Sequence, residues 1–453
     1  MNTPTATPEW KQILRPFAIL SAMGAASFVL QSELRGSFLL SFAAPPHPNS
    51  YLDWLAALPG FLLLILLLQE VFRRIWPNRI QEITTILYGS VFLFCSPRPF
   101  VSSVLIIGAT AFFYLELFTR KFRKTLASRA LYLALAVLIL YVPVAIYQCR
   151  LELDTSQFFF LLIFKTCFMM RLVSWIVDRR LYEREDHGSL TDFLEFLLCP
   201  IFLVIPGQIQ YFTYQYFHRS KAPVESDRDY WIAAGIGAWG IFLIGLYNIA
   251  DIYFAQHFVP WLDHKDIWTR AFIYLGAGFY WLLTVYFLQA GGMSFQVCMA
   301  RCLGYQIKYD MHRPLAARSP LDYLRRHSSY VRDYIVEVGV RPIGLGLLRY
   351  GIKPEIVAPV AAILSYAVLI LPQTGYRADY SRPFASSFVL VGFLILFILI
   401  SRLPFFSKNR SSIESPIDEK AFRDWTTRDF ALWAGTLLIL AVSKALFIFC
   451  RTL

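Results

Sequence analysis

The side chains best suited to chemistry gather in one stretch of the chain, between positions 312 and 333. They are two histidines, three arginines and two aspartates: His312, His327, Arg325, Arg326, Arg332, Asp322 and Asp333. A histidine titrates near neutral pH, so it can take a proton from a reacting group or return one to it. A carboxylate can orient such an imidazole, and the guanidinium fork of arginine matches the geometry of a phosphate. The stretch therefore contains the parts of an acid–base site beside an anion site.

Each of these residues also has a purely structural interpretation. The two histidines would then cap or pack helices at a membrane interface. The three arginines would form a basic rim on the cytoplasmic side, where it meets anionic lipid. The residue types alone leave both interpretations open.

The elements that must position this stretch are membrane helices. Of the 453 residues, 57% are hydrophobic, 17% aromatic and only 16% charged, and the mean hydropathy is +0.50. Soluble chains are usually about 45–50% apolar and about 25% charged. The apolar residues come in runs long enough to cross a hydrocarbon core about 30 Å thick. This composition excludes a disordered chain and argues against a nucleic-acid module or a soluble enzyme.

The sequence predicts an all-α polytopic membrane protein with about 11–12 transmembrane helices. The predicted spans are residues 16–31, 54–69, 81–95, 99–118, 130–148, 156–177, 190–206, 231–254, 271–289, 356–372, 384–401 and 430–450. Three basic loops fall on one side of the membrane if the amino terminus is cytoplasmic, which also explains the net charge of +12. We find no linker of domain size, so residues 1–453 are predicted to form a single integral membrane domain.

Residues 290–355 differ from the spans around them. They contain ten Lys and Arg residues against five acids, which makes them too polar to cross a bilayer. Apolar residues nevertheless recur there at helical spacing, for example Val331, Ile335 and Val338. We therefore expect helices that lie along the cytoplasmic face or dip into it, covered by neighbouring helices.

Three blocks of this sequence resemble the membrane-bound O-acyltransferase family. Residues 287–305 (FLQAGGMSFQVCMARCLGY) resemble a glycine-containing stretch of the family, and residues 312–334 resemble its NRP, RRWH and RDY patterns. Residues 189–209 resemble a proline-containing block upstream of them. The resemblance covers about 190–335 and is nearest to the bacterial branch that acylates cell-surface polymers.

The resemblance implies helices around a central tunnel and acyl transfer from a thioester, with acyl-CoA as the co-substrate. The acceptor would be a hydroxyl of a lipid, a glycan or a small metabolite. A histidine would deprotonate that hydroxyl as it attacks the thioester. No histidine follows position 327, so the usual WHG histidine is absent, and residues 357–370 offer only Ser365 and Tyr366.

The resemblance then leaves His327 as the first candidate for the base and His312 as the second. Asp322 or Asp333 would orient the base, and Arg325, Arg326 and Arg332 would bind the phosphates of the donor. The alternative is a catalytically inactive member of the same fold, which acts as a membrane scaffold or as a subunit of a larger complex. We expect membrane lipid, the donor, the acceptor and protein partners in the membrane as its contacts, and no nucleic acid.

Two further expectations concern metals and location. The seven cysteines form no CxxC pair, so the sequence predicts neither a metal site nor a disulfide framework, and it predicts no bound cofactor. The resemblance favours the bacterial inner membrane over an endomembrane.

Overall fold

In the part of the chain that it describes, the computed structural model consists of helices joined by turns and short irregular segments. It describes residues 14–23, 25, 49–94, 99–119, 168, 170–179, 189–199, 213–221, 227–257, 266–307, 313–327, 329–369, 399–400 and 424–452, and no strand occurs among them. The prediction of an all-α chain is therefore confirmed for these residues. The chain divides into two compact units, Met1–Ala25 with His47–Val204, and Ala26–Pro46 with Ile205–Leu453. The prediction of a single membrane domain stays a prediction.

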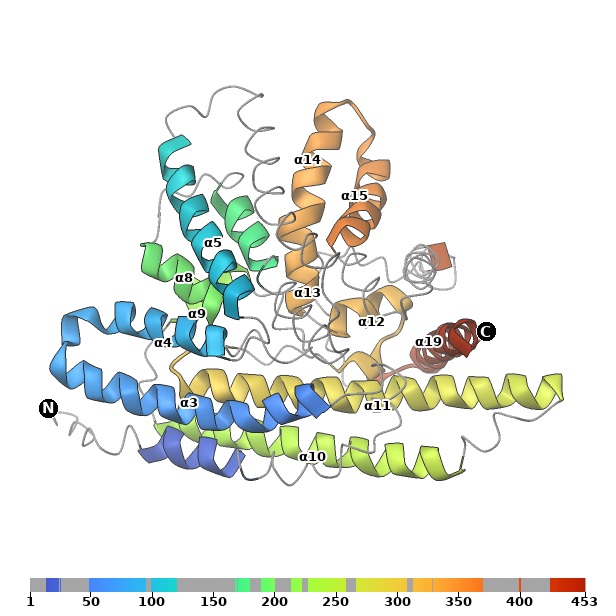
Figure 1. The fold of residues 1–453 in the computed structure, drawn as a ribbon. Helices are drawn as coiled ribbons and strands as arrows, with labels where there is room; N and C mark the ends of the chain where they lie inside the picture. The colour runs from blue at the N-terminus through green and yellow to red at the C-terminus, as the bar shows by residue number, and fades with distance from the viewer. Residues whose placement is uncertain are drawn as a thin grey trace, which may run out of the picture. The chain divides into compact units, whose positions relative to one another are not determined.

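The first unit contains four labelled helices (Figure 1), α3 (Asn49–Ile75), α4 (Ile80–Phe94), α5 (Pro99–Thr119) and α8 (Leu190–Leu198). Helix α8 begins at a capping box in which Ser189 and Asp192 bond each other's backbone N–H groups. Its carboxyl end is held by Arg171, whose Nη1 donates to the carbonyls of Phe196 at 3.0 Å and Leu197 at 2.9 Å. The buried guanidinium thus satisfies carbonyls that a helix end leaves without intrahelical partners.

The second unit is built on two long helices, α10 (Asp227–His257) and α11 (Ile267–Cys302). At 1.5 Å per residue, the 36 residues of α11 extend about 54 Å, well beyond the thickness of a hydrocarbon core. Residues 290–300 of α11 are buried on every side. The helix ends at Cys302 and is followed by Gly304, which has φ +89°. The N–H groups of Gly304 and Tyr305 bond the carbonyls of Arg301 and Ala300, respectively.

Glycines allow the long helices to approach each other at the level of the backbone. A Cβ added at Gly240 of α10 would lie 2.9 Å from the Gly291 carbonyl oxygen and 2.9 Å from the Cβ of Ser294, both on α11. A Cβ added at Gly278 of α11 would overlap the carbonyl of Ala441 on α19 (Thr427–Thr452). Small residues at helix crossings are typical of membrane bundles, where association depends on close packing.

The polar stretch that follows α11 folds into a chain of short helices. They are the 3₁₀ turn Pro314–Ala316, α12 (Pro320–His327), α13 (Ser329–Tyr334), a π-helical turn η7 (Ile335–Val340) and α14 (Arg341–Arg349). Helix α15 (Pro354–Leu369) then packs against α14 and η7. The predicted helical spacing within residues 290–355 is confirmed, and its placement at the cytoplasmic face stays a prediction.

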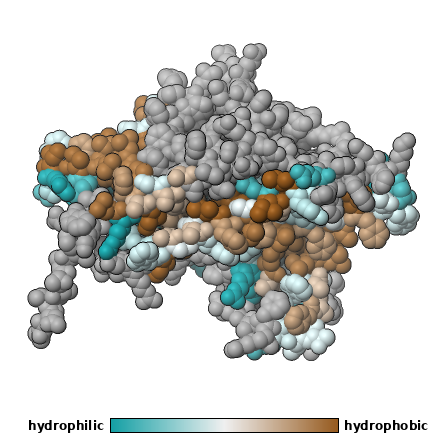
Figure 2. All heavy atoms as spheres, turned by 90° about the horizontal axis from the view of Figure 1, so that it is seen from below, coloured by the Kyte–Doolittle hydropathy of each residue, from teal (hydrophilic) through white to brown (hydrophobic). Residues whose placement is uncertain are grey.

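Two of the described helices are long and apolar enough to cross a membrane, over Tyr230–Phe254 and Trp268–Cys302. Large apolar side chains point outward from them, with Trp231 77%, Trp268 75% and Phe272 76% exposed. Figure 2, which views the side on which α10 lies in Figure 1, shows hydrophobic residues over much of the described surface.

Several predicted spans coincide with helices of the protein. The runs at 54–69, 81–95, 99–118, 231–254 and 430–450 fall on α3, α4, α5, α10 and α19, respectively. The run at 190–206 contains α8, which ends at Leu198, and the run at 271–289 is part of the longer α11. The run at 130–148 and most of 384–401 lie outside the described residues.

Candidate functional site

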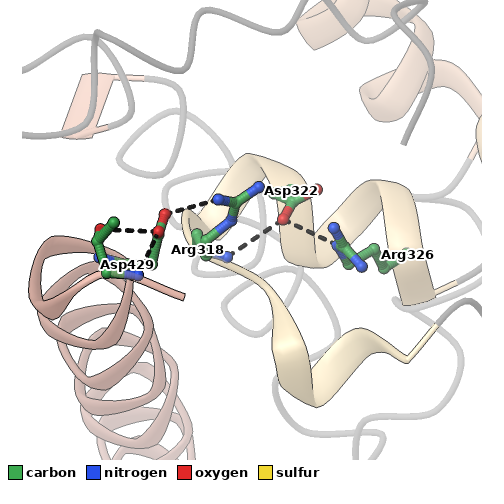
Figure 3. A network of polar contacts seen from close by, with 5 residues as sticks. Arg318, Asp322, Arg326 and Asp429 are labelled. Atoms are coloured by element: carbon green, nitrogen blue, oxygen red, sulfur yellow. Dashed lines mark hydrogen bonds and ion pairs between the residues drawn. The ribbon is translucent and has the colours of Figure 1, made fainter. Parts of the chain in front are cut away.

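The candidate residues are concentrated on the short helix α12, whose first turn is capped by Ser319. The N–H of Asp322 donates to the hydroxyl of Ser319, 3.0 Å away. The carboxylate of Asp322 accepts two hydrogen bonds in turn, from Nε of Arg326 at 2.8 Å and from the backbone N–H of Arg318 at 3.2 Å. Figure 3 shows the two contacts of the Asp322 carboxylate, with Arg318 and Arg326. Asp322 therefore fixes the start of α12 and neutralises Arg326, which lies one turn further along.

A buried ion pair ties the segment that precedes α12 to α19. Nη1 of Arg318 lies 2.6 Å from Oδ1 of Asp429, and the two side chains are only 8% and 10% exposed (Figure 3). The other oxygen of Asp429 accepts from the N–H of Thr426 at 2.9 Å, and the hydroxyl of Thr426 accepts from the N–H of Asp429. Asp429 thus caps α19 and binds Arg318 with the same carboxylate.

An apolar cluster supports the ion pair from α11, α12 and α19. Leu282, Ala317, Tyr323 and Leu440 are buried in it together, and Leu315 packs against them. The indole N–H of Trp433 on α19 donates to the carbonyl of Leu315, 2.7 Å away. Burial raises the pKa of the Tyr323 hydroxyl well above its usual range, so this tyrosine stays neutral. The cluster and the ion pair together hold α12 against two long helices.

A second polar group lies on α13 and α9 (Tyr214–Ser220). Asp333 accepts from the hydroxyl of Tyr216 at 3.1 Å and from Nε of Arg332 at 2.7 Å. The rings of Tyr216 and Tyr330 meet edge to face, with centroids 5.6 Å apart. Partial burial and the charge of Asp333 raise the pKa of Tyr216 to about 12. Asp333 therefore connects α13 to α9 and neutralises Arg332.

His327 is the last residue of α12, and its side chain is half-buried. Tyr323 lies one turn earlier on the same face, and the two ring centroids are 5.3 Å apart. Asp322 is five positions before His327, so helical geometry places it on a different face. The ring of Tyr323 therefore lies beside His327, the candidate base. Asp322 and Asp333 each accept a hydrogen bond from an arginine.

The three predicted donor-binding arginines differ in their access to solvent. Arg325 and Arg326 are buried, at 2% and 5% exposed, and Arg332 is partly exposed. Burial lowers the pKa of Arg325. The negative charge of Asp322 raises this pKa, whereas the positive charges of Arg332 and Arg326 lower it further. Of the three, Arg332 is the most accessible to an anionic group. His312 lies outside the described residues.

The sequence analysis missed the residues that hold the site in place, namely Arg318, Asp429 and Tyr216. One signal was readable: Thr426 and Asp429 form a T-x-x-D pattern directly before the last apolar run, which is typical of a helix start. Within the described residues, no group of three or more His, Cys, Asp or Glu side chains could hold a metal ion. No model of a known protein family matches the chain, and no curated protein matches it.

Proposed function

We propose that the protein is an integral membrane O-acyltransferase that moves an acyl group from a thioester donor, acyl-CoA, to a hydroxyl of a lipid, glycan or small metabolite. The observation that carries the proposal is the placement of His327. Its half-buried imidazole lies at the end of a helix that is fixed by the Asp322–Arg326 and Arg318–Asp429 ion pairs. A catalytic base needs a fixed position, and the ion pairs that hold α12 support this role for His327.

The proposal includes a membrane architecture of about 11–12 spans around a central tunnel, like that of the membrane-bound O-acyltransferases. The amino terminus is cytoplasmic, and the membrane is the bacterial inner membrane. Two helices long and apolar enough to cross a bilayer support this placement, together with the outward-facing aromatic residues of α10 and α11. The close crossing at Gly240 and Gly291 also supports it, since small residues are common where membrane helices meet.

In the proposed reaction His327 takes the proton of the acceptor hydroxyl as the oxygen attacks the thioester carbonyl. The carbon–sulfur bond of the tetrahedral intermediate then breaks. The imidazolium returns its proton to the departing thiolate, so that the ester and free coenzyme A leave. Arg332, with its partly exposed guanidinium, is the first candidate to meet a phosphate of the donor.

The test is release of free thiol from acetyl-CoA and longer acyl-CoAs by the purified protein in nanodiscs with lipid extract. We expect turnover that His327→Ala abolishes and His327→Gln does not restore. The matched control is His218→Ala, because His218 is an exposed histidine on α9 in the same unit. Turnover that is equal in the wild type and in His327→Ala would refute the assignment of the base.

A second function is favoured by the ion pairs themselves. Each of three arginines, Arg318, Arg326 and Arg332, forms an ion pair with an aspartate, so these charges contribute to the structure itself. This observation supports a catalytically inactive protein of the same fold that acts as a membrane scaffold or partner subunit. The absence of thiol release with every donor, from a protein that unfolds cooperatively, would favour this second function.

A further inference from the structure

Helices α14 and α15 form a hairpin whose turn is well defined. The turn residue Gly351 has φ +77°, a conformation that residues with a Cβ rarely adopt. The N–H of Ile352 bonds the carbonyl of Leu347, and the N–H of Gly351 bonds that of Leu348. These two bonds make a Schellman end, which fixes the direction of the chain as it leaves α14. The two helices pack at Gly344, where an added Cβ would meet Val357 at 3.5 Å.

The hairpin carries large apolar side chains on its outward faces. Leu345 and Leu348 of α14 are 54% and 44% exposed, and Ile356 and Leu364 of α15 are 51% and 42% exposed. The last two lie eight residues apart, so they share one face of α15. The adjacent stripe of α15 is buried at Val357, Ala361 and Ser365. The hairpin therefore buries part of its surface within the protein and presents apolar side chains beside it.

The turn of the hairpin combines an aromatic side chain with two cations. Tyr350 is 87% exposed, and Arg349 and Lys353 on either side of it are also exposed. Tyrosine and long cationic side chains at the end of an apolar element are typical of the interface between hydrocarbon and lipid headgroups. Along the hairpin, an apolar body is followed by an aromatic and basic tip. A lipid leaflet has the same order, because its hydrocarbon layer is followed by the headgroup layer.

We propose that the α14–α15 hairpin docks into a lipid leaflet and that its tip binds the phosphate of anionic phospholipid headgroups. Leu345, Leu348, Ile356 and Leu364 contact acyl chains, and the phenol of Tyr350 lies at the headgroup level. Arg349 and Lys353 supply the positive charge, and each cation near an anionic surface favours contact by roughly fivefold. The inference rests on the membrane placement of the proposed function and is independent of acyl transfer.

The test places the photo-crosslinker p-benzoylphenylalanine at position 350 of the full chain. The protein is reconstituted in nanodiscs with equal amounts of phosphatidylcholine and phosphatidylglycerol, irradiated, and its lipid adducts are identified by mass spectrometry. We expect adducts at position 350 that favour phosphatidylglycerol by roughly 25-fold, since two cations act together. In the Arg349→Gln/Lys353→Gln background, the ratio should return to about one.

A matched site and two opposing outcomes make the test decisive. The crosslinker at position 364 should yield lipid adducts without a headgroup preference, because Leu364 lies on the apolar face far along α15 from the tip. Adducts at position 350 that carry protein instead of lipid would refute the proposal, since a protein partner would then cover the tip. Equal adducts with both lipids in the wild-type background would refute it as well. Neither result depends on thiol release, so a failure here is distinct from a failure of the proposed activity.

Discussion

The close helix crossings in the second unit make a quantitative prediction about glycine. A Cβ added at Gly240 of α10 would lie 2.9 Å from the Gly291 carbonyl oxygen, and one added at Gly278 of α11 would lie 3.0 Å from the backbone N of Ala445 on α19. Backbone atoms cannot turn aside as a flexible side chain can, so whole helices would have to separate. We predict that Gly240→Ala and Gly278→Ala destabilise the folded protein.

The magnitude follows from two opposing effects. Overpacking a filled contact typically costs about 1–3 kcal/mol. Replacing glycine by alanine in a helix contributes about 1 kcal/mol in the other direction. The helices offer matched controls that isolate the first effect, because a Cβ added at Gly235, Gly245 or Gly435 meets no atom within 4 Å. Relative to these controls, we expect the free energy of unfolding of each crossing variant to be lower by about 1–3 kcal/mol.

The assay is unfolding of the purified variants in mild detergent by titration with a denaturing detergent, followed by tryptophan fluorescence. The control variants should unfold at the wild-type midpoint or above it. Gly278→Ala should show the larger loss, since its added methyl would overlap the Ala441 carbonyl itself. If the crossing variants and the controls have the same midpoint, the helices do not approach at these glycines and our account of the packing is wrong.

Two further predictions concern the polar contacts around α12 and α13. Removing either partner of the buried Arg318–Asp429 pair should destabilise the protein by about 3–5 kcal/mol, because the other charge stays buried. The double variant Arg318→Met/Asp429→Asn should lose less than the sum of the single variants in the same titration, and strict additivity would show that the pair does not interact. The raised pKa of Tyr216 predicts a pH dependence. The folded state keeps the phenol protonated up to about pH 12, whereas the unfolded state releases its proton near pH 10. The stability that comes from the raised pKa of Tyr216 is therefore fully present below pH 10 and is lost as the pH rises from 10 to 12. Tyr216→Phe should remove that part of the decline, measured as the unfolding midpoint against pH, and an unchanged decline would contradict the assignment.

Hydrophobic length predicted the positions of the long helices well. The runs at 81–95 and 99–118 agree within two residues with α4 and α5, because each run is predominantly apolar and is bounded by polar or proline residues. The span predicted at 271–289 ends before helix α11 does, since α11 continues to Cys302. Ser294, Gln296 and Arg301 lower the hydropathy of the next turns, yet residues 290–300 continue α11 and are buried by other parts of the protein. Composition measures the affinity of a segment for lipid and cannot detect burial by protein.

The candidate site was predictable as a set of residue types but not as an arrangement. Arg318 and Asp429 are 111 positions apart, and nothing local in a single sequence pairs them. Asp322 lies three residues after Ser319, whose hydroxyl accepts from its N–H, so it belongs to the first turn of α12, and its role in orienting His327 stays a prediction.

The ion pairs bear on both proposed functions in the same way, because rigid support serves a catalytic base and a scaffold equally. Three arginine–aspartate pairs give part of the charge of this stretch a structural role that needs no substrate. The density of arginines is therefore no argument for catalysis. What separates the two functions is His327, whose neighbour on the helix is the ring of Tyr323. A scaffold needs only the packing of that imidazole, which a glutamine or a leucine can largely replace, whereas a base needs its titration near neutral pH. The decisive comparison is thus between His327 variants that fold equally well, with thiol release and unfolding measured on the same preparations.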